Sequence, residues 1–167
     1  VAGQVERRAD AHVRKDVVRI ADPDAELFIN DYNVEYNWGQ AAEYRDLILK
    51  IKEMGGPVTG VGMQAHFWDC CRPNIDELVK NVNIVAEAGL PIRFTEYDYG
   101  GNLTQLEQAQ DFIKVLTIAF SHPSITGMIC WGLSDDGAWR DNTGFFDASH
   151  RPKIAADTLL YYTKTKW

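Results

Sequence analysis

Cysteine, long apolar runs and positive charge are all scarce in this chain of 167 residues. Its three cysteines are Cys70, Cys71 and Cys130. They form no CxxC or Cys/His spacing of the kind that binds zinc, and their odd number argues against a full disulfide framework. A single bridge from Cys70 or Cys71 to another cysteine stays open as an alternative.

The lack of a long apolar run makes a membrane span unexpected, because such a span needs roughly 18 consecutive apolar residues. Residues 1–8 do not form a signal peptide, since no apolar segment follows them. The net charge is −7, so nucleic acid and anionic membranes are unfavourable partners. The composition fits a substrate with little or no charge.

Motifs for metal and cofactor chemistry are absent as well. The chain contains no HExxH helix, no glycine-rich phosphate loop and no paired CxxC, so we expect neither a metal nor a cofactor. It contains no internal repeat and no low-complexity segment. With 46% hydrophobic and 25% charged residues, it has the composition of one soluble globular domain with a sizeable core.

Apolar runs and helical periodicity alternate along the chain. Strands are predicted over residues 26–31, 59–66, 91–97 and 126–132. Helices are predicted over residues 6–20, 40–54 and 103–120, from the N-cap Asn74 to Gly89, and from Pro152 or Lys153 onward. Strand starts recur about every 30 to 36 residues, which is typical of βαβ units that build a parallel sheet. The predicted fold class is therefore α/β.

Each predicted strand ends in polar or aromatic residues. The sharpest case is the run Ile92–Asp98, where an apolar strand ends at Glu96. Burying a carboxylate there costs several kcal/mol unless it is paired or hydrogen-bonded. A (β/α) barrel builds its active site from the carboxyl ends of successive strands. The long connection 133–151 follows another strand end, and a loop of that length is usually functional or disordered.

Five segments resemble glycoside hydrolase family 10, the endo-β-1,4-xylanases, in their order and approximate spacing. The segments are Leu27–Asn33, Gly62–His66, Thr95–Asp98, Trp131–Trp139, and Phe145–Asp147 followed by Arg151–Lys153. The resemblance covers residues from about 12 to 160, nearly the whole chain. One such segment is weak evidence, but five in order are strong.

The resemblance implies a (β/α)8 TIM barrel of about 250 residues or more, of which this chain supplies strands five to eight. Residues 1–167 are then the carboxyl-terminal half of the catalytic domain, beginning inside the helix after strand four. The first half should carry the general acid/base glutamate in an Asn-Glu pair, and no Asn-Glu dipeptide occurs here. The family also implies a secreted or cell-surface location.

The resemblance assigns catalytic roles to three residues. Glu96 matches the nucleophile, His66 matches the histidine that hydrogen-bonds it, and Asp98 matches the carboxylate that orients this histidine. Residues two apart on a strand share a face, so Glu96 and Asp98 are expected on the same side. Retaining glycosidases use two carboxyl groups about 5–5.5 Å apart, one as nucleophile and one as acid/base.

The same resemblance assigns substrate binding to Gln64, Asn30, Trp131, Trp139 and Tyr32. The two amides can donate to and accept from sugar hydroxyls. Trp131 and Trp139 match the tryptophans that wall the glycone side, where aromatic faces pack on a pyranose ring. Tyr32 resembles an aromatic on the aglycone side. Loop capping and core packing are the structural alternatives.

Some residues near these segments received no firm role. Asn33 is either a sugar ligand or a loop cap. Arg140 could reach a sugar hydroxyl or pair with Asp135 or Asp136. No family position could be carried over to Trp38, Trp68 and Tyr97.

The function predicted from these residues is a retaining endo-β-1,4-xylanase acting on xylan or xylooligosaccharides within a complete barrel. The expected partner is the missing amino-terminal half, as part of the same parent chain, as a second chain or through self-association. The chain by itself is expected to be inactive. Two alternatives remain: an inactive carbohydrate-binding or scaffold half barrel, and another retaining barrel glycosidase such as a cellulase or mannanase.

Overall fold

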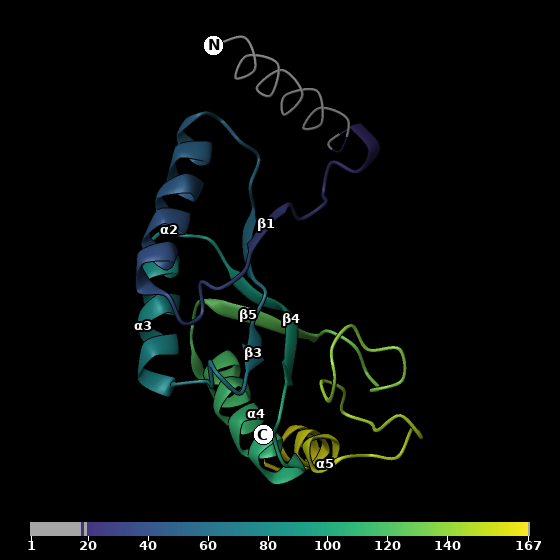
Figure 1. Ribbon diagram of the computed structural model, residues 1–167. Helices are drawn as coiled ribbons and strands as arrows, with labels where there is room; N and C mark the ends of the chain where they lie inside the picture. Colours follow the sequence, from purple (N-terminus) through teal and green to yellow (C-terminus); the bar gives the residue numbers. More distant parts are fainter. Residues whose placement is uncertain (1–17, 19, 167) are drawn as a thin grey trace.

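A computed structural model describes residue 18 and residues 20–166 (Figure 1). Nearly all of the helix predicted over residues 6–20 lies outside this range. The sheet contains five parallel strands: β1 (Phe28–Asp31), β2 (Gly60–Met63), β3 (His66–Trp68), β4 (Ile92–Gly100) and β5 (Ile125–Cys130). β2 joins β1 to β4, β3 pairs with the last residues of β4, and β5 pairs with β4 as well.

The strand predicted over residues 59–66 is interrupted and becomes β2 and β3. The break falls at Ala65, whose φ of 63° is left-handed and cannot continue a strand. The Ala65 N–H donates to Glu35 Oε1 at 2.5 Å and not to a neighbouring strand. This turn lies between Gln64 and His66, so it sets the direction of both side chains.

Four α-helices follow the strands: α2 (Trp38–Glu53), α3 (Ile75–Ala86), α4 (Gln105–Ser121) and α5 (Ile154–Tyr161), the last continuing as a π-helical turn η1 (Tyr162–Lys166). The predicted N-cap Asn74 is confirmed, since its side chain accepts from Glu77 N–H. Thr104 and Glu107 form a reciprocal capping box at the start of α4. These local hydrogen bonds place the helix starts where polar residues interrupt the apolar pattern.

The core lies between the sheet and the helices. Figure 1 shows α2, α3 and α4 following one another along the sheet, with α5 beside α4. Their apolar faces meet the strands at fully buried side chains, among them Ile48, Met63, Val82, Phe94 and Val115. No helix within residues 20–166 is long and apolar enough to cross a membrane.

Strand β4 contains an irregularity that positions the site. Its pairing with β5 shifts register between Phe94 and Tyr97. As a result the adjacent side chains of Thr95 and Glu96 both hydrogen-bond Asn30 of β1. A regular strand would have sent one of the two to the opposite face.

The long connection before α5 is ordered around a buried cation. The Lys153 side chain is only 2% exposed, and its Nζ lies 2.8 Å from Asp135 Oδ2. The same Nζ donates to Asn142 Oδ1 at 2.9 Å. Asp135 Oδ1 also accepts from the Gly144 N–H. The loop that carries Trp139 is therefore tied down at both ends.

Candidate active site

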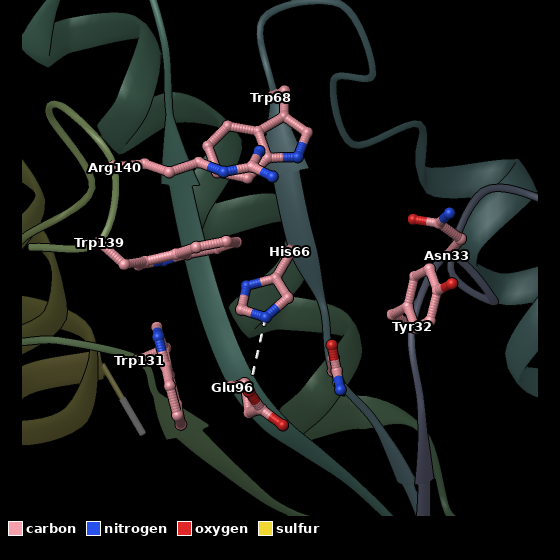
Figure 2. Close-up of a pocket in the computed structure, with 9 residues that line it drawn as sticks. Tyr32, Asn33, His66, Trp68, Glu96, Trp131, Trp139 and Arg140 are labelled. Carbon is pink, nitrogen blue, oxygen red and sulfur yellow. Dashed lines mark ion pairs between the residues drawn. The ribbon is translucent and has the colours of Figure 1, made fainter.

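The side chains predicted to form the site gather in a pocket of about 300 Å³ at the carboxyl ends of the strands (Figure 2). Its lining residues are Tyr32, Asn33, Gln64, His66, Trp68, Glu96, Trp131, Trp139 and Arg140. Asn30 and Asp98, the remaining predicted residues, hydrogen-bond lining side chains from outside the pocket. All eight predicted site residues therefore belong to one cluster.

Glu96 is held by polar contacts on both carboxylate oxygens. Asn30 Nδ2 donates to Glu96 Oε1 at 2.6 Å. His66 Nε2 lies 3.5 Å from Glu96 Oε2, and the dashed line in Figure 2 marks this ion pair. Asn30 is fixed in turn, since Thr95 Oγ1 donates to its Oδ1 at 2.7 Å. The carboxylate therefore has a set orientation at the pocket floor.

Asp98 connects the histidine to the tryptophan wall. It is buried and accepts from His66 Nδ1 at 2.7 Å on one oxygen and from Trp139 Nε1 at 2.6 Å on the other. Burial lowers the pKa of His66, but the hydrogen bond and charge of Asp98, with Glu96 adding, outweigh it and leave that pKa raised. The imidazole is thus biased toward the protonated form, which donates to Asp98 and forms an ion pair with Glu96.

Three exposed aromatic rings surround the polar cluster. Trp131 and Trp139 are 47% and 49% exposed, and Tyr32 is 56% exposed. The His66 ring lies 5.0 Å from Trp139 and meets Trp131 edge-on at 6.4 Å. Tyr32 stands across the pocket from the two tryptophans (Figure 2). Large apolar faces left open to solvent beside polar groups suit the stacking of a ligand ring.

Two backbone hydrogen bonds fix the position of Gln64. Its N–H donates to Asp31 O at 2.9 Å, and its carbonyl accepts from Glu96 N–H at 3.0 Å. The residue thus bridges β1 and β4 just before the left-handed turn at Ala65. Its amide side chain lines the pocket and is placed to face a ligand.

Three further residues line the pocket although no firm role was predicted for them: Trp68, Asn33 and Arg140. Arg140 does not pair with Asp135 or Asp136, because Lys153 and His150 take those carboxylates. Its guanidinium stacks on Trp68 and Trp139. Asn33 lines the pocket, and its Oδ1 accepts from the Tyr36 hydroxyl.

Tyr97 belongs to the core and not to the site. Its ring is 2% exposed and packs against Phe67 and Phe112, with centroids 6.2 Å and 5.4 Å away. Side-chain alternation along β4 turns Tyr97 toward Phe112 of α4 while leaving Glu96 and Asp98 on the side of the pocket. A tyrosine between two site carboxylates is thus a packing residue.

Glu35 is a buried carboxyl group that no periodicity in the sequence marks. It is 1% exposed, and burial raises its pKa to about 7 against the hydrogen bond from Ala65. Its Oε2 has no hydrogen-bond partner among residues 20–166. Through the Ala65 N–H it supports the turn that carries Gln64 and His66.

The three cysteines are all free thiols, and Cys70 Sγ lies 3.1 Å from Cys71 Sγ. The disulfide considered for Cys70 or Cys71 is therefore not formed. In the part of the chain that the structure describes, no group of three or more His, Cys, Asp or Glu side chains could hold a metal ion.

The sequence model of the family described as glycosyl hydrolase family 10 matches residues 15–162 of this chain. This chain belongs to glycosyl hydrolase family 10. Endo-1,4-beta-xylanase A of Thermoanaerobacterium saccharolyticum is 36% identical over 125 residues, which cover 71% of this chain and 11% of that protein. Exoglucanase XynX of Acetivibrio thermocellus matches with the same identity, length and coverage. Endo-1,4-beta-xylanase B of Humicola insolens is 31% identical over 159 residues, 84% of this chain and 44% of that protein.

Solved structures of family 10 enzymes share the fold. TsXylA, an intracellular xylanase from Thermoanaerobacterium saccharolyticum, superimposes with a TM-score of 0.75 at 31% identity, over 87% of this chain and 47% of that one. Native xylanase 10B from Thermotoga maritima superimposes with a TM-score of 0.77 at 28% identity, over 89% of this chain and 49% of that one. The family fold is the (β/α)8 barrel, which confirms the predicted fold class. The chain spans less than half the length of these relatives and neighbours.

Proposed function

We propose that this chain supplies the nucleophile side of a retaining endo-β-1,4-xylanase, with Glu96 as the nucleophile. The observation that carries the proposal is the Glu96 carboxylate, held by Asn30 and His66 at the floor of a pocket walled by Trp131 and Trp139. A nucleophilic carboxylate must be ionised and aimed at one point. Contacts on both oxygens provide this aim.

In the proposed reaction Glu96 attacks the anomeric carbon of a xylosyl residue, and the bond to the leaving sugar's oxygen breaks. The leaving oxygen takes a proton from the acid/base glutamate, which lies outside this chain. A glycosyl ester on Glu96 results. Water then attacks the same carbon, gives its proton to the acid/base group and releases Glu96 with net retention.

The surrounding residues bind and orient the sugar. Trp131 and Trp139 stack on the glycone side, and Tyr32 on the aglycone side. Gln64 lines the pocket and bonds sugar hydroxyls, whereas Asn30, predicted to do the same, acts on Glu96 from outside the pocket. His66 with Asp98 holds the charge of Glu96 in place. Binding of xylooligosaccharides is supported by a neighbour structure that shows a TsXylA variant in complex with xylotetraose.

Residues 1–167 are proposed to be the carboxyl-terminal half of the barrel, with strands five to eight. The coverage of 47% of TsXylA and the absence of an Asn-Glu dipeptide support this. Within residues 20–166, strand β1 pairs only with β2 and β5 only with β4, so each leaves one edge for the amino-terminal half. That half would bring the acid/base glutamate opposite Glu96.

Covalent trapping tests the nucleophile directly. The complete protein that contains this chain is treated with an activated 2-fluoro-xyloside, digested and read by mass spectrometry. The label is expected on the peptide with Glu96. Glu96→Ala should remove the label and lower kcat/KM by at least about 10³-fold, whereas Glu43→Ala, on the exposed surface of α2, should change neither. A label on a peptide without Glu96 would refute the assignment.

A glucan-cleaving glycosidase is the second candidate, because Exoglucanase XynX is among the relatives at 36% identity. The two substrates differ by a hydroxymethyl group that must fit beside Trp131 and Trp139. Comparing kcat/KM on aryl xylobioside and aryl cellobioside separates them, and a preference for the cellobioside would replace xylan as substrate. A protein that only binds xylooligosaccharides would release no reducing sugar from either.

A further inference from the structure

Arg140 differs from the other arginines that the structure describes. Each of the other four forms an ion pair: Arg45 with Asp46 and Glu87, Arg72 with Glu107 and Asp111, Arg93 with Glu26, and Arg151 with Asp147. Arg140 has no carboxylate partner in residues 20–166, although the chain carries a net charge of −7. A cation left without a protein anion at the rim of a binding pocket is available to a ligand.

The guanidinium is nevertheless held in place. Its Cζ lies 3.5 Å from the centroid of the Trp68 ring and 4.2 Å from that of Trp139. Figure 2 shows it next to both rings, on the same side of the pocket as Trp131. The two indoles meet edge to face, with their centroids 5.6 Å apart, and the guanidinium rests against both, so its position is set while its planar N–H donors can still reach a ligand. That fork matches the two oxygens of a carboxylate.

A second hollow extends the pocket past Trp139. It measures about 390 Å³ and is lined by Trp68, Gly101, Trp139, Arg140 and Asp141. Trp68, Trp139 and Arg140 line both spaces, so a ligand on the glycone wall can continue into the hollow. The volume is within the range of small-molecule sites and suits one further sugar ring.

We propose that Arg140 binds the carboxylate of a uronic-acid substituent carried by the sugar chain, with that ring in the hollow against Trp68. This proposal rests on the proposed function, because it takes the main chain of the ligand to be xylan at Trp131 and Trp139. Asp141 opposes an anion there. The carboxylate of Asp69 is engaged by the Cys70 and Asn102 N–H groups. The stacked arginine therefore decides between acidic and neutral substituents.

The test compares two substrates on the complete protein: a linear xylotetraose and the same tetraose bearing one glucuronosyl branch. The readout is the ratio of kcat/KM for the acidic over the neutral substrate. Arg140→Gln should lower this ratio about tenfold, as expected for a charge-assisted hydrogen bond near the surface. Arg140→Lys should lower it less, because it keeps the charge but not the planar fork. Raising the salt concentration should also lower the wild-type ratio.

Two further variants serve as controls. Arg151→Gln removes the same charge from an ion pair with Asp147, which lines neither space, and should leave the ratio unchanged. Asp141→Asn removes the opposing carboxylate and should raise it. An equal loss on both substrates in Arg140→Gln would mean that Arg140 only supports Trp139, which overturns the proposal. Absence of hydrolysis of the neutral tetraose by the wild type would instead refute the proposed function.

Discussion

Asp98 is the residue on which most of the site depends. One buried carboxylate accepts from both His66 and Trp139, so it fixes a charged group and a stacking wall together. A hydrogen bond to a charged group contributes roughly 1.5–3 kcal/mol. Losing it therefore affects the chemistry and the binding surface at once.

Asp98→Asn tests this dependence. The neutral amide keeps the size but removes the charge that raises the pKa of His66, so that pKa is expected to fall. kcat/KM should drop roughly 10- to 100-fold, the equivalent of one charged hydrogen bond. NMR titration of the His66 imidazole and steady-state kinetics provide the measurements. Asp76→Asn, at the exposed start of α3, is the control, and an unshifted His66 in Asp98→Asn would contradict the account.

Glu35 should make stability depend on pH with a defined sign. Burial raises its pKa from 4.5 to about 7, so the folded state prefers the protonated carboxyl. This contribution to the free energy of unfolding is fully present below about pH 4.5 and is lost as the pH rises from 4.5 through 7. The total loss is on the order of 3 kcal/mol. Glu35→Gln should flatten this part of the profile in urea unfolding of the complete protein.

The control for Glu35 is Glu107, a glutamate whose pKa is lowered and not raised. A hydrogen bond from the Thr104 backbone lowers the pKa of Glu107, so its contribution is lost as the pH falls. Glu107→Gln should therefore change only the acidic end of the profile. A slope between pH 4.5 and 8 that is the same in Glu35→Gln and wild type would show that Glu35 is not the titrating group.

At the scale of elements, strand β2 passes close to Asn30, the residue that hydrogen-bonds Glu96, and the closest approach is at Gly62. A Cβ on Gly62 would stand 2.4 Å from Asn30 Oδ1 and 2.9 Å from Thr95 Cγ2. No side chain fits there while Asn30 still reaches Glu96. The glycine therefore serves the close approach of two side chains across neighbouring strands.

Gly62→Ala is expected to displace Asn30 and so release Glu96 Oε1. The loss of this charged hydrogen bond should lower the rate of fluoro-xyloside trapping roughly 10- to 100-fold. Gly127→Ala in β5 is the matched control, since its Cβ would meet nothing closer than Arg93 Cγ at 3.6 Å. Equal trapping rates in the two variants would rule out this role for Gly62.

At the scale of the molecule, the chain exposes what a closed barrel would cover. In the part of the chain that the structure describes, β1 and β5 each have a strand partner on one side only, and Ile129 of β5 is 56% exposed. Open strand edges and exposed apolar side chains favour association with another chain. The isolated chain is thus expected to self-associate or to bind the amino-terminal half.

The purified 167-residue chain should have little xylanase activity without an acid/base group. Reducing-sugar release from xylan is expected to be about 10²- to 10⁴-fold below that of the complete protein. Adding the separately produced amino-terminal half should restore turnover, and circular dichroism checks that the chain is folded. Turnover by the chain within tenfold of the complete protein would contradict the missing-half proposal.

Much of the fold could be predicted because strands and helices follow local patterns. Alternating apolar runs located the four strands, and the Asn74 cap located α3. The break at Ala65 could not be predicted, because it depends on a hydrogen bond from the Ala65 N–H to a glutamate 30 residues earlier. The register shift in β4 likewise arises from pairing with β5, which no local window contains.

The sequence by itself determined which groups would meet: Glu96, His66 and Asp98 stand at the ends of predicted parallel strands, and such ends share one edge of a sheet. Only the tertiary structure decided how they meet. Asn30 reaches Glu96, Asp98 holds Trp139, and Arg140 stacks on Trp68 and Trp139. These contacts join side chains from different elements, and their geometry follows from packing, a bulge and a left-handed turn, none of which the order of residues displays.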